Sequence, residues 1–208
     1  MVPESNGDYR FSVLVAGVVL AAGRSERMGS PKALLEFRGR SFLETVLQTM
    51  ALAGVDSRIV VAGPNAALVA PVVPMGVILV SAGTGPQPID SVRAGVRAAG
   101  DADGILVWPI DHPRVEPATV RALLAAFRPT TAIVAPSFRH RRGHPVIWAR
   151  ETWDSLMVDR AGDREGARGV ARLFPVRHVD VSDEAVVEDI DTPEAYARLV
   201  SRESERHA

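Results

Sequence analysis

The residues with the most chemical potential follow the first apolar run, where the chain reads LAAGRSERMGSPK over residues 20–32. Gly23 can adopt a positive φ and turn backbone N–H groups inward, and such amides form a nest for an anion. Cationic and hydroxyl side chains crowd the same stretch, namely Arg24, Ser25, Arg27 and Lys32. Together they suit a polyphosphate better than a single carboxylate. A solvated surface loop is the alternative, because the spacing matches neither a Walker loop nor the dinucleotide-binding fingerprint.

The composition limits the partners that such a loop can serve. The chain has 208 residues, a formal net charge of -1 and no cysteine. We therefore expect one ordinary domain without disulfides, thiolate metal sites or cysteine nucleophiles. A nearly neutral chain has no global field that recruits nucleic acid or an anionic membrane, so any anion site is local. No signal peptide or membrane span is evident, and we expect a cytoplasmic protein with flexible tails at 1–12 and 201–208.

Short apolar, β-branched runs alternate with helical patterns along most of the chain. The apolar runs predict strands buried on both faces at 13–23, 57–63, 75–83, 104–111 and 131–137. The helical patterns lie between them, at 41–54, 90–100 and 116–127. This alternation predicts an α/β fold, with a mostly parallel sheet covered on both sides in one domain over 13–200. After residue 138 we expect a turn, a helix, two short strands and a last helix that begins near 192.

Polar loops follow the first, third and fourth of these predicted strands. The loop after the third strand reads SAGTGPQPIDS, and the loop after the fourth reads PIDHP. Ligands of open α/β sheets bind beyond the carboxyl ends of the strands. We therefore expect the three loops to share one crevice.

The motifs, taken in order, resemble those of the MobA/MocA-like nucleotidyltransferases, the branch that handles molybdenum cofactor. LAAGRSERMGSPK is similar to the signature L-A-[AG]-G-x-S-x-R-M-G-x-x-K. Four later segments resemble the family's D-x-P, G-[NH]-P, G-D-x-G-A-R and D-x-D-T-P-E-D motifs: PIDHP, RRGHP, GDREGAR and EDIDTPEAY. The resemblance runs from about residue 13 to 200. It implies a three-layer α/β/α fold of the Rossmann-like, GT-A-like nucleotide-diphospho-sugar transferase architecture.

The resemblance implies transfer of a nucleotidyl group from an NTP to a phosphate-bearing acceptor, with release of pyrophosphate. The residues implied to line the base and ribose are Leu20, Ala21, Ala22 and Gly23. The residues implied to wrap the triphosphate are Arg24, Ser25, Arg27, Met28 and Gly29. Lys32 is implied to lie near the α-phosphate, and with Arg27 it would stabilise the charge that builds during transfer. Members with L-A-A-G tend to use CTP, so Ala22 favours CTP over GTP.

The same resemblance implies a Mg²⁺ ion as cofactor, bound by Asp111 at the end of the fourth strand. Magnesium commonly takes one or two carboxylates plus phosphate oxygens. The alternative for Asp111 is a turn residue before Pro113. The implied second ligand is Asp191, with Asp189 as its competitor, although the segment that starts at Asp191 is also a good helix start.

The acceptor side departs from the family pattern. The third loop, GTGPQPIDSV, looks instead like that of the cytidylyltransferases of isoprenoid synthesis. The base contacts expected from this region are Ala82, Gly83, Asp90 and Ser91. The residues that fall on acceptor-side motifs are His144, Pro145, Asp163 and Arg168. Most other arginines of the C-terminal third are expected on a solvated surface, and the tryptophans in the packed core. His140 and His144 are not expected to bind zinc, since glycine and proline prevent a helix there.

These inferences favour a cytidylyltransferase that acts on molybdopterin or a related cofactor. Its partners would be CTP, a phosphorylated small-molecule acceptor and a molybdoenzyme that receives the product, with no nucleic acid and no membrane. One alternative is a nucleotidyltransferase for a sugar or polyol phosphate. The other is a chaperone that binds a nucleotide or cofactor without turnover. The sequence leaves the acceptor and the oligomeric state open.

Overall fold

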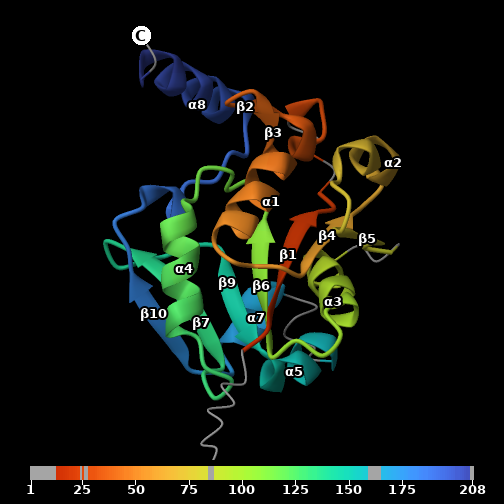
Figure 1. Cartoon of the computed structure of the whole chain (residues 1–208), viewed down its shortest axis with the longest axis vertical. Coiled ribbons are helices and arrows are strands. Elements are labelled where there is room, and N and C mark those ends of the chain that lie inside the picture. Colours follow the sequence, from red (N-terminus) through yellow and green to blue (C-terminus); the bar gives the residue numbers. More distant parts are fainter. Residues whose placement is uncertain (1–12, 24, 26–27, 84–86, 159–164, 207–208) are drawn as a thin grey trace, which may run out of the picture.

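The central sheet is mixed and mostly parallel, as expected. The computed structural model describes residues 13–23, 25, 28–83, 87–158 and 165–206, with side chains described as far as residue 202. Within these residues, eight strands form one sheet in the order β10-β7-β9-β6-β1-β4-β5, and β8 pairs with β7 (Figure 1). The strands are β1 (Val15–Ala21), β4 (Arg58–Ala62), β5 (Ile78–Ser81), β6 (Gly104–Pro109), β7 (Ile133–Phe138), β8 (Arg141–Arg142), β9 (Val146–Ala149) and β10 (Val176–Asp180).

Strand β1 lies at the centre because nearly all of its side chains are buried. It pairs in parallel with β4 on one side and with β6 on the other. Alternate side chains of β1 point to opposite faces, so Val19 joins one apolar cluster and Val18 joins the other. Burial on both faces explains the continuous apolar run in the sequence.

Helices cover both faces of the sheet and complete the three layers. Helices α1 (Phe42–Leu52) and α4 (Pro117–Ala126) pack on one face, and α3 (Pro88–Ala98), α5 (Trp153–Val158) and α7 (Ala167–Ala171) pack on the other (Figure 1). Helix α1 begins with a capping box, in which the Ser41 hydroxyl accepts from the Glu44 N–H and the Glu44 carboxylate accepts from the Ser41 N–H. Among the described helices, none is long and apolar enough to cross a membrane.

Short elements connect these layers. They are the hairpin of β2 (Glu36–Phe37) and β3 (Arg40–Ser41), the helix α2 (Ala66–Val69), and the 3-10 turns at Lys32–Leu34, Ala70–Val72, Arg150–Thr152 and Glu184–Val187. The last helix, α8 (Pro193–Arg206), extends into the stretch expected as a tail. The Tyr196 hydroxyl of α8 donates to the carbonyl of Glu36 at 2.9 Å, which fastens the helix to the hairpin.

The structure corrects two expectations about the elements. The run 75–83 was expected to be buried on both faces, but β5 is an edge strand with Ile78 and Leu79 exposed. In the C-terminal third, the two short strands β8 and β9 precede the helices α5 and α7, and only β10 follows them. The run Val146–Ala149 is fully buried because β9 lies antiparallel between β6 and β7.

Candidate active site

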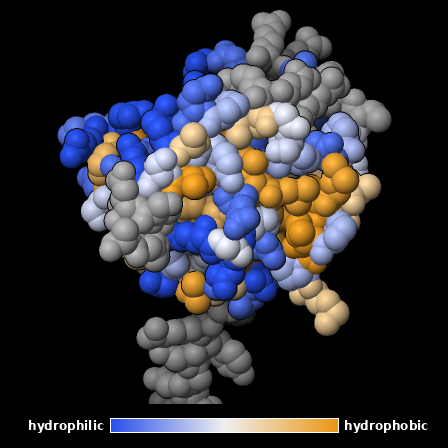
Figure 2. All heavy atoms as spheres, turned by 90° about the horizontal axis from the view of Figure 1, so that it is seen from above, coloured by the Kyte–Doolittle hydropathy of each residue, from blue (hydrophilic) through white to orange (hydrophobic). Residues whose placement is uncertain are grey.

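A cavity of about 350 Å³ opens where β1 and β6 end. Leu20 of β1 and Pro109 of β6 are register partners, so the segments that follow the two strands begin side by side. The lining residues are Leu20, Ala21, Gly23, Ser25, Met28, Pro31, Lys32, Ala33, Pro109, Ile110, Asp111 and Asp191. Figure 2, viewed onto this edge of the sheet, shows apolar and hydrophilic side chains next to each other on the surface.

The segment after β1 is folded back on itself through Ser25. Ser25 has a positive φ of 54°, and its carbonyl accepts from the Met28 N–H at 2.9 Å. Its hydroxyl oxygen accepts from the backbone N–H of Lys32 at 3.0 Å. At the start of the segment, a Cβ on Gly63 would lie 2.3 Å from the carbonyl oxygen of Ala22, so only glycine permits this approach. These constraints fix where the Lys32 side chain begins.

Three charged side chains from distant parts of the sequence meet in this cavity. The Lys32 ammonium lies 3.4 Å from Oδ2 of Asp111 and also donates to Oδ1 of Asp191. Asp191 reaches the site because the N–H of Ile190 donates to the carbonyl of Asp111 at 2.9 Å. Asp189 instead lines a separate, smaller cavity beside Arg114 and Arg202. Asp191, and not Asp189, is therefore the carboxylate at this site.

The Asp111 carboxylate lacks a hydrogen-bond partner for one of its two oxygens. Its Oδ1 is buried and has no hydrogen-bond partner. Burial raises the pKa of the Asp111 carboxyl above its ordinary value, while the neighbouring His112 and Lys32 act in the opposite direction. The Nε2 atom of His112 lies 3.8 Å from this oxygen, which is too long for a hydrogen bond. The imidazole is held by its Nδ1, which donates to the carbonyl of Ala185 at 3.2 Å.

The carboxylate pair fits a hard divalent cation. Two carboxylates converge on one positive charge, and the orphaned Asp111 oxygen has unused acceptor capacity. Among the described residues, no group of three or more His, Cys, Asp or Glu is arranged for a metal ion. A cation here would take its remaining ligands from water or from a substrate, which is the common pattern for magnesium.

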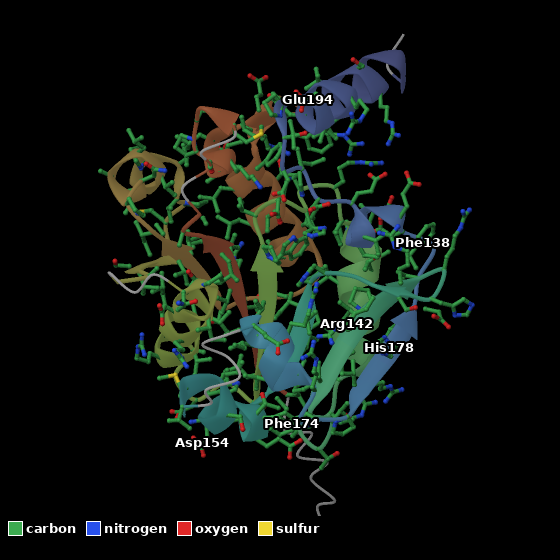
Figure 3. The ribbon with its side chains drawn as sticks, turned by 180° about the vertical axis from the view of Figure 1, so that it is seen from behind. Phe138, Arg142, Asp154, Phe174, His178 and Glu194 are labelled. Atoms are coloured by element: carbon green, nitrogen blue, oxygen red, sulfur yellow. The ribbon has the colours of Figure 1, made fainter. Side chains whose placement is uncertain are left out.

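A second cavity, of about 680 Å³, adjoins the first and shares Leu20 and Pro109 with it. Its wall includes the apolar side chains of Val92 and Trp148 and the cations Arg142 and Arg168, among other residues. In Figure 3, Arg142 lies on the face of the sheet that α7 covers. Arg142 is exposed, but partial desolvation at the cavity wall, followed by the charge of Arg168, lowers its pKa.

His144 also lines the second cavity. Its Nδ1 is buried and has no hydrogen-bond partner, and its ring centroid lies 5.2 Å from that of His112. Burial, together with the charges of His112, Arg142 and Arg168, lowers the pKa of His144 to about 3. The imidazole is therefore neutral at physiological pH, and the arginines supply the positive charge of this cavity.

Comparison with known proteins identifies the family. The model of the MobA-like NTP transferase domain matches residues 17–181. The chain belongs to this family. It is 36% identical to the nicotine blue oxidoreductase of Paenarthrobacter nicotinovorans, over 89% of this chain and 96% of the relative. It is 31% identical to the molybdenum cofactor guanylyltransferase of Xanthomonas euvesicatoria pv. vesicatoria, over 88% and 93%. Among solved structures, Rv0371c of Mycobacterium tuberculosis H37Rv in complex with manganese is 32% identical, with a TM-score of 0.72 and coverage of 90% and 98%.

The structure brings together most of the residues predicted from the signature of this MobA-like chain. The first cavity is lined by Leu20, Ala21, Gly23, Ser25, Met28, Lys32, Asp111 and Asp191, and the second by His144 and Arg168. Ala22, Gly29 and Pro145 line neither of these two cavities, although each adjoins a residue that does. Arg24, Arg27 and Asp163 fall outside the described residues.

The region after β5 does not contribute to either of these cavities at its predicted positions. Ala82, Gly83, Asp90 and Ser91 line neither. The Asp90 carboxylate accepts from the N–H of Gln87 at 3.1 Å and pairs with Arg93 at 3.3 Å, so it caps α3. Helix α3 instead reaches the second cavity through Pro88 and Val92.

Sequence reasoning did not assign two side chains near the site. Arg142 is exposed on β8, as expected for most arginines of this region, and it also lines the second cavity. His112 was not singled out, yet it is buried between Asp111 and His144. The signal for His112 was its position next to the metal-type carboxylate in PIDHP.

Proposed function

We propose that this protein is a Mg²⁺-dependent nucleotidyltransferase that transfers CMP from CTP to a phosphate-bearing acceptor of the molybdopterin type and releases pyrophosphate. The observation that carries the proposal is the meeting of Lys32 with two carboxylates, Asp111 and Asp191, from segments 79 and 159 residues away. Family membership supports nucleotidyl transfer. It does not decide the reaction alone, since one relative is named as an oxidoreductase.

The reaction needs little covalent help from the protein. An oxygen of the acceptor phosphate attacks the α-phosphorus, and the bond from this phosphorus to the bridging oxygen of the β-phosphate breaks. The bridging oxygen leaves with pyrophosphate. The attacking phosphate is already an anion, so no side chain has to remove a proton. In-line positioning and charge neutralisation supply most of the acceleration in such transfers.

Each part of the site has a role in this scheme. The Lys32 ammonium would interact with the phosphate oxygens and stabilise the charge on the leaving group, and Arg27 is expected to assist. Asp111 and Asp191 would hold the Mg²⁺ ion. When bound, Mg²⁺ would neutralise charge on the triphosphate. The similar Rv0371c was solved in complex with manganese, which supports a divalent cation in this fold.

The second cavity suits the acceptor. Arg142 and Arg168 offer two cations for a phosphate group, and Trp148 and Val92 offer an apolar wall for a ring system. The neutral imidazole of His144 can exchange hydrogen bonds with polar atoms of the ring. The shared boundary at Leu20 and Pro109 allows a ligand in this cavity to approach one in the first.

The preference for CTP rests on Ala22, through the L-A-A-G form of the signature. The relative from Xanthomonas is named as a guanylyltransferase, so CTP and GTP must be compared directly. Pyrophosphate release should be measured with each nucleotide, Mg²⁺ and either molybdopterin or sugar and polyol phosphates. Faster release with CTP and molybdopterin is expected. Release only with a sugar phosphate would select the alternative transferase, and tight nucleotide binding without release would select a chaperone.

The catalytic assignment is tested with isosteric variants. Asp111→Asn and Asp191→Asn should each lower turnover by about 100-fold or more, a size usual for loss of one electrostatic group at a transition state. Asp189→Asn is the matched control because it removes a carboxylate two residues away that faces another cavity. Equal turnover in Asp189→Asn and Asp191→Asn would refute the assignment.

A further inference from the structure

Lys32 occupies the position that a metal ion would need. Its ammonium lies between Oδ2 of Asp111 and Oδ1 of Asp191, and only 13% of its side chain is exposed. The same two carboxylates are the ones expected to hold Mg²⁺. A divalent cation bound to these carboxylates would lie close to the ammonium, and the repulsion between the two positive charges would weaken the binding of both.

The type of cation at this position is unusual for this protein. Lys32 is the only lysine in the chain, which otherwise contains 23 arginines. An arginine would grip the carboxylates through a rigid fork of donors, whereas an ammonium is a compact point charge on a flexible four-carbon stem. A lysine can therefore leave the carboxylates and reach another anion without moving the backbone.

The charges around the Asp111 and Asp191 carboxylates would change when Lys32 leaves them. Lys32 contacts both the Asp111 and the Asp191 carboxylate, so its departure changes the charge balance of both. His112 lies too far from Asp111 to donate a hydrogen bond, and the second Asp111 oxygen is without a partner. Loss of the Lys32 ammonium would remove the charge that lies between these two carboxylates.

We propose that Lys32 holds the metal position in the metal-free protein, and that divalent cation and nucleotide bind cooperatively through its release. A triphosphate that draws the ammonium away frees the carboxylates for the cation. By linkage, a cation on the carboxylates frees Lys32 for the phosphates to the same extent. The nucleotide part of this inference rests on the proposed function, but the competition between Lys32 and the cation does not.

The competition is measured without any nucleotide. Mn²⁺ binding to the full chain is followed by electron paramagnetic resonance for the wild type and for Lys32→Met. The variant should bind Mn²⁺ about 10- to 100-fold more tightly, because a charged hydrogen bond to the carboxylates no longer has to be broken. Equal or weaker binding by Lys32→Met, or no binding by either protein, would overturn the inference.

Two control variants distinguish the release of Lys32 from a simple change in net charge as the cause of tighter Mn²⁺ binding. Lys32→Arg keeps the positive charge and should bind Mn²⁺ no more tightly than the wild type. Arg97→Met removes one positive charge from the exposed last turn of α3, away from the carboxyl ends of the strands, and should also match the wild type. If Arg97→Met tightened Mn²⁺ binding as much as Lys32→Met, release of Lys32 would not be the cause.

A second measurement needs no variant and uses the single lysine. Protein grown with ¹³C-labelled lysine gives one Cε resonance, which reports on Lys32 alone. Mg²⁺ without nucleotide should shift this resonance, and CTP or GTP should shift it again. If the resonance stays unchanged at a saturating Mg²⁺ concentration, the release of Lys32 is refuted. If Mg²⁺ shifts the resonance but no pyrophosphate forms with any acceptor, the proposed function fails while the competition stands.

Discussion

The pH dependence of stability provides a quantitative test of the second cavity. The pKa of His144 is about 3 in the folded chain, against 6.5 as its ordinary value. Between these two values the unfolded chain binds more protons, so stability falls as pH falls. One pKa unit is worth 1.36 kcal/mol, and at pH 4 the loss attributable to His144 is about 3 kcal/mol. Above pH 7 both states are neutral, and the contribution vanishes.

The matched variant is His144→Asn, because the G-[NH]-P motif accepts either residue at this position. Urea unfolding at pH 7, 5.5 and 4 should show the wild type losing about 3 kcal/mol more than His144→Asn. The raised pKa of Asp111 has the opposite sign, since the folded chain then holds the extra proton, but it is present in both proteins and cancels. Parallel pH profiles for the two proteins would refute the burial of a neutral imidazole beside Arg142 and Arg168.

Three further changes test the local geometry. Gly63→Ala places a Cβ against the carbonyl of Ala22 and should lower the free energy of unfolding by about 1–3 kcal/mol, measured by urea titration; no change would mean that the two segments are not in contact. Ser25→Ala removes the acceptor for the Lys32 N–H and should raise the KM for the nucleotide while costing about 1 kcal/mol of stability; an unchanged KM would separate the loop from nucleotide binding. Tyr196→Phe removes one exposed hydrogen bond to β2 and should cost about 1 kcal/mol or less in thermal unfolding; a larger loss would mean that α8 is held mainly by this hydroxyl.

The parallel part of the fold was predictable because buried strands leave an unambiguous pattern. Strand β1 is apolar on both faces, and its neighbours β4 and β6 repeat the pattern. The exposed edge strand β5 has the same composition, so composition alone could not distinguish an edge from an interior position. In the C-terminal third, Val146–Ala149 is short and follows a cation-rich turn, which concealed a fully buried strand.

The sequence motif predicted the candidate-site residues that lie directly after a strand. It did not predict those whose position depends on long-range contacts. Lys32 and Asp111 follow two strands that are register neighbours, so their meeting follows from the topology. The choice between Asp189 and Asp191 depended on the hydrogen bond from Ile190 to Asp111, which no local pattern encodes. Arg142 is exposed, as expected, but a run of surface-type cations does not reveal which of them lines a cavity.

The proposed function puts the reaction where the two cavities meet. Leu20 and Pro109 belong to both linings, and they are paired residues at the ends of β1 and β6. Beyond this pair, Lys32 and the two carboxylates lie on one side, and the arginines beside the neutral His144 lie on the other. A triphosphate on the first side and an anionic acceptor on the second would therefore have their reacting atoms closest over Leu20 and Pro109.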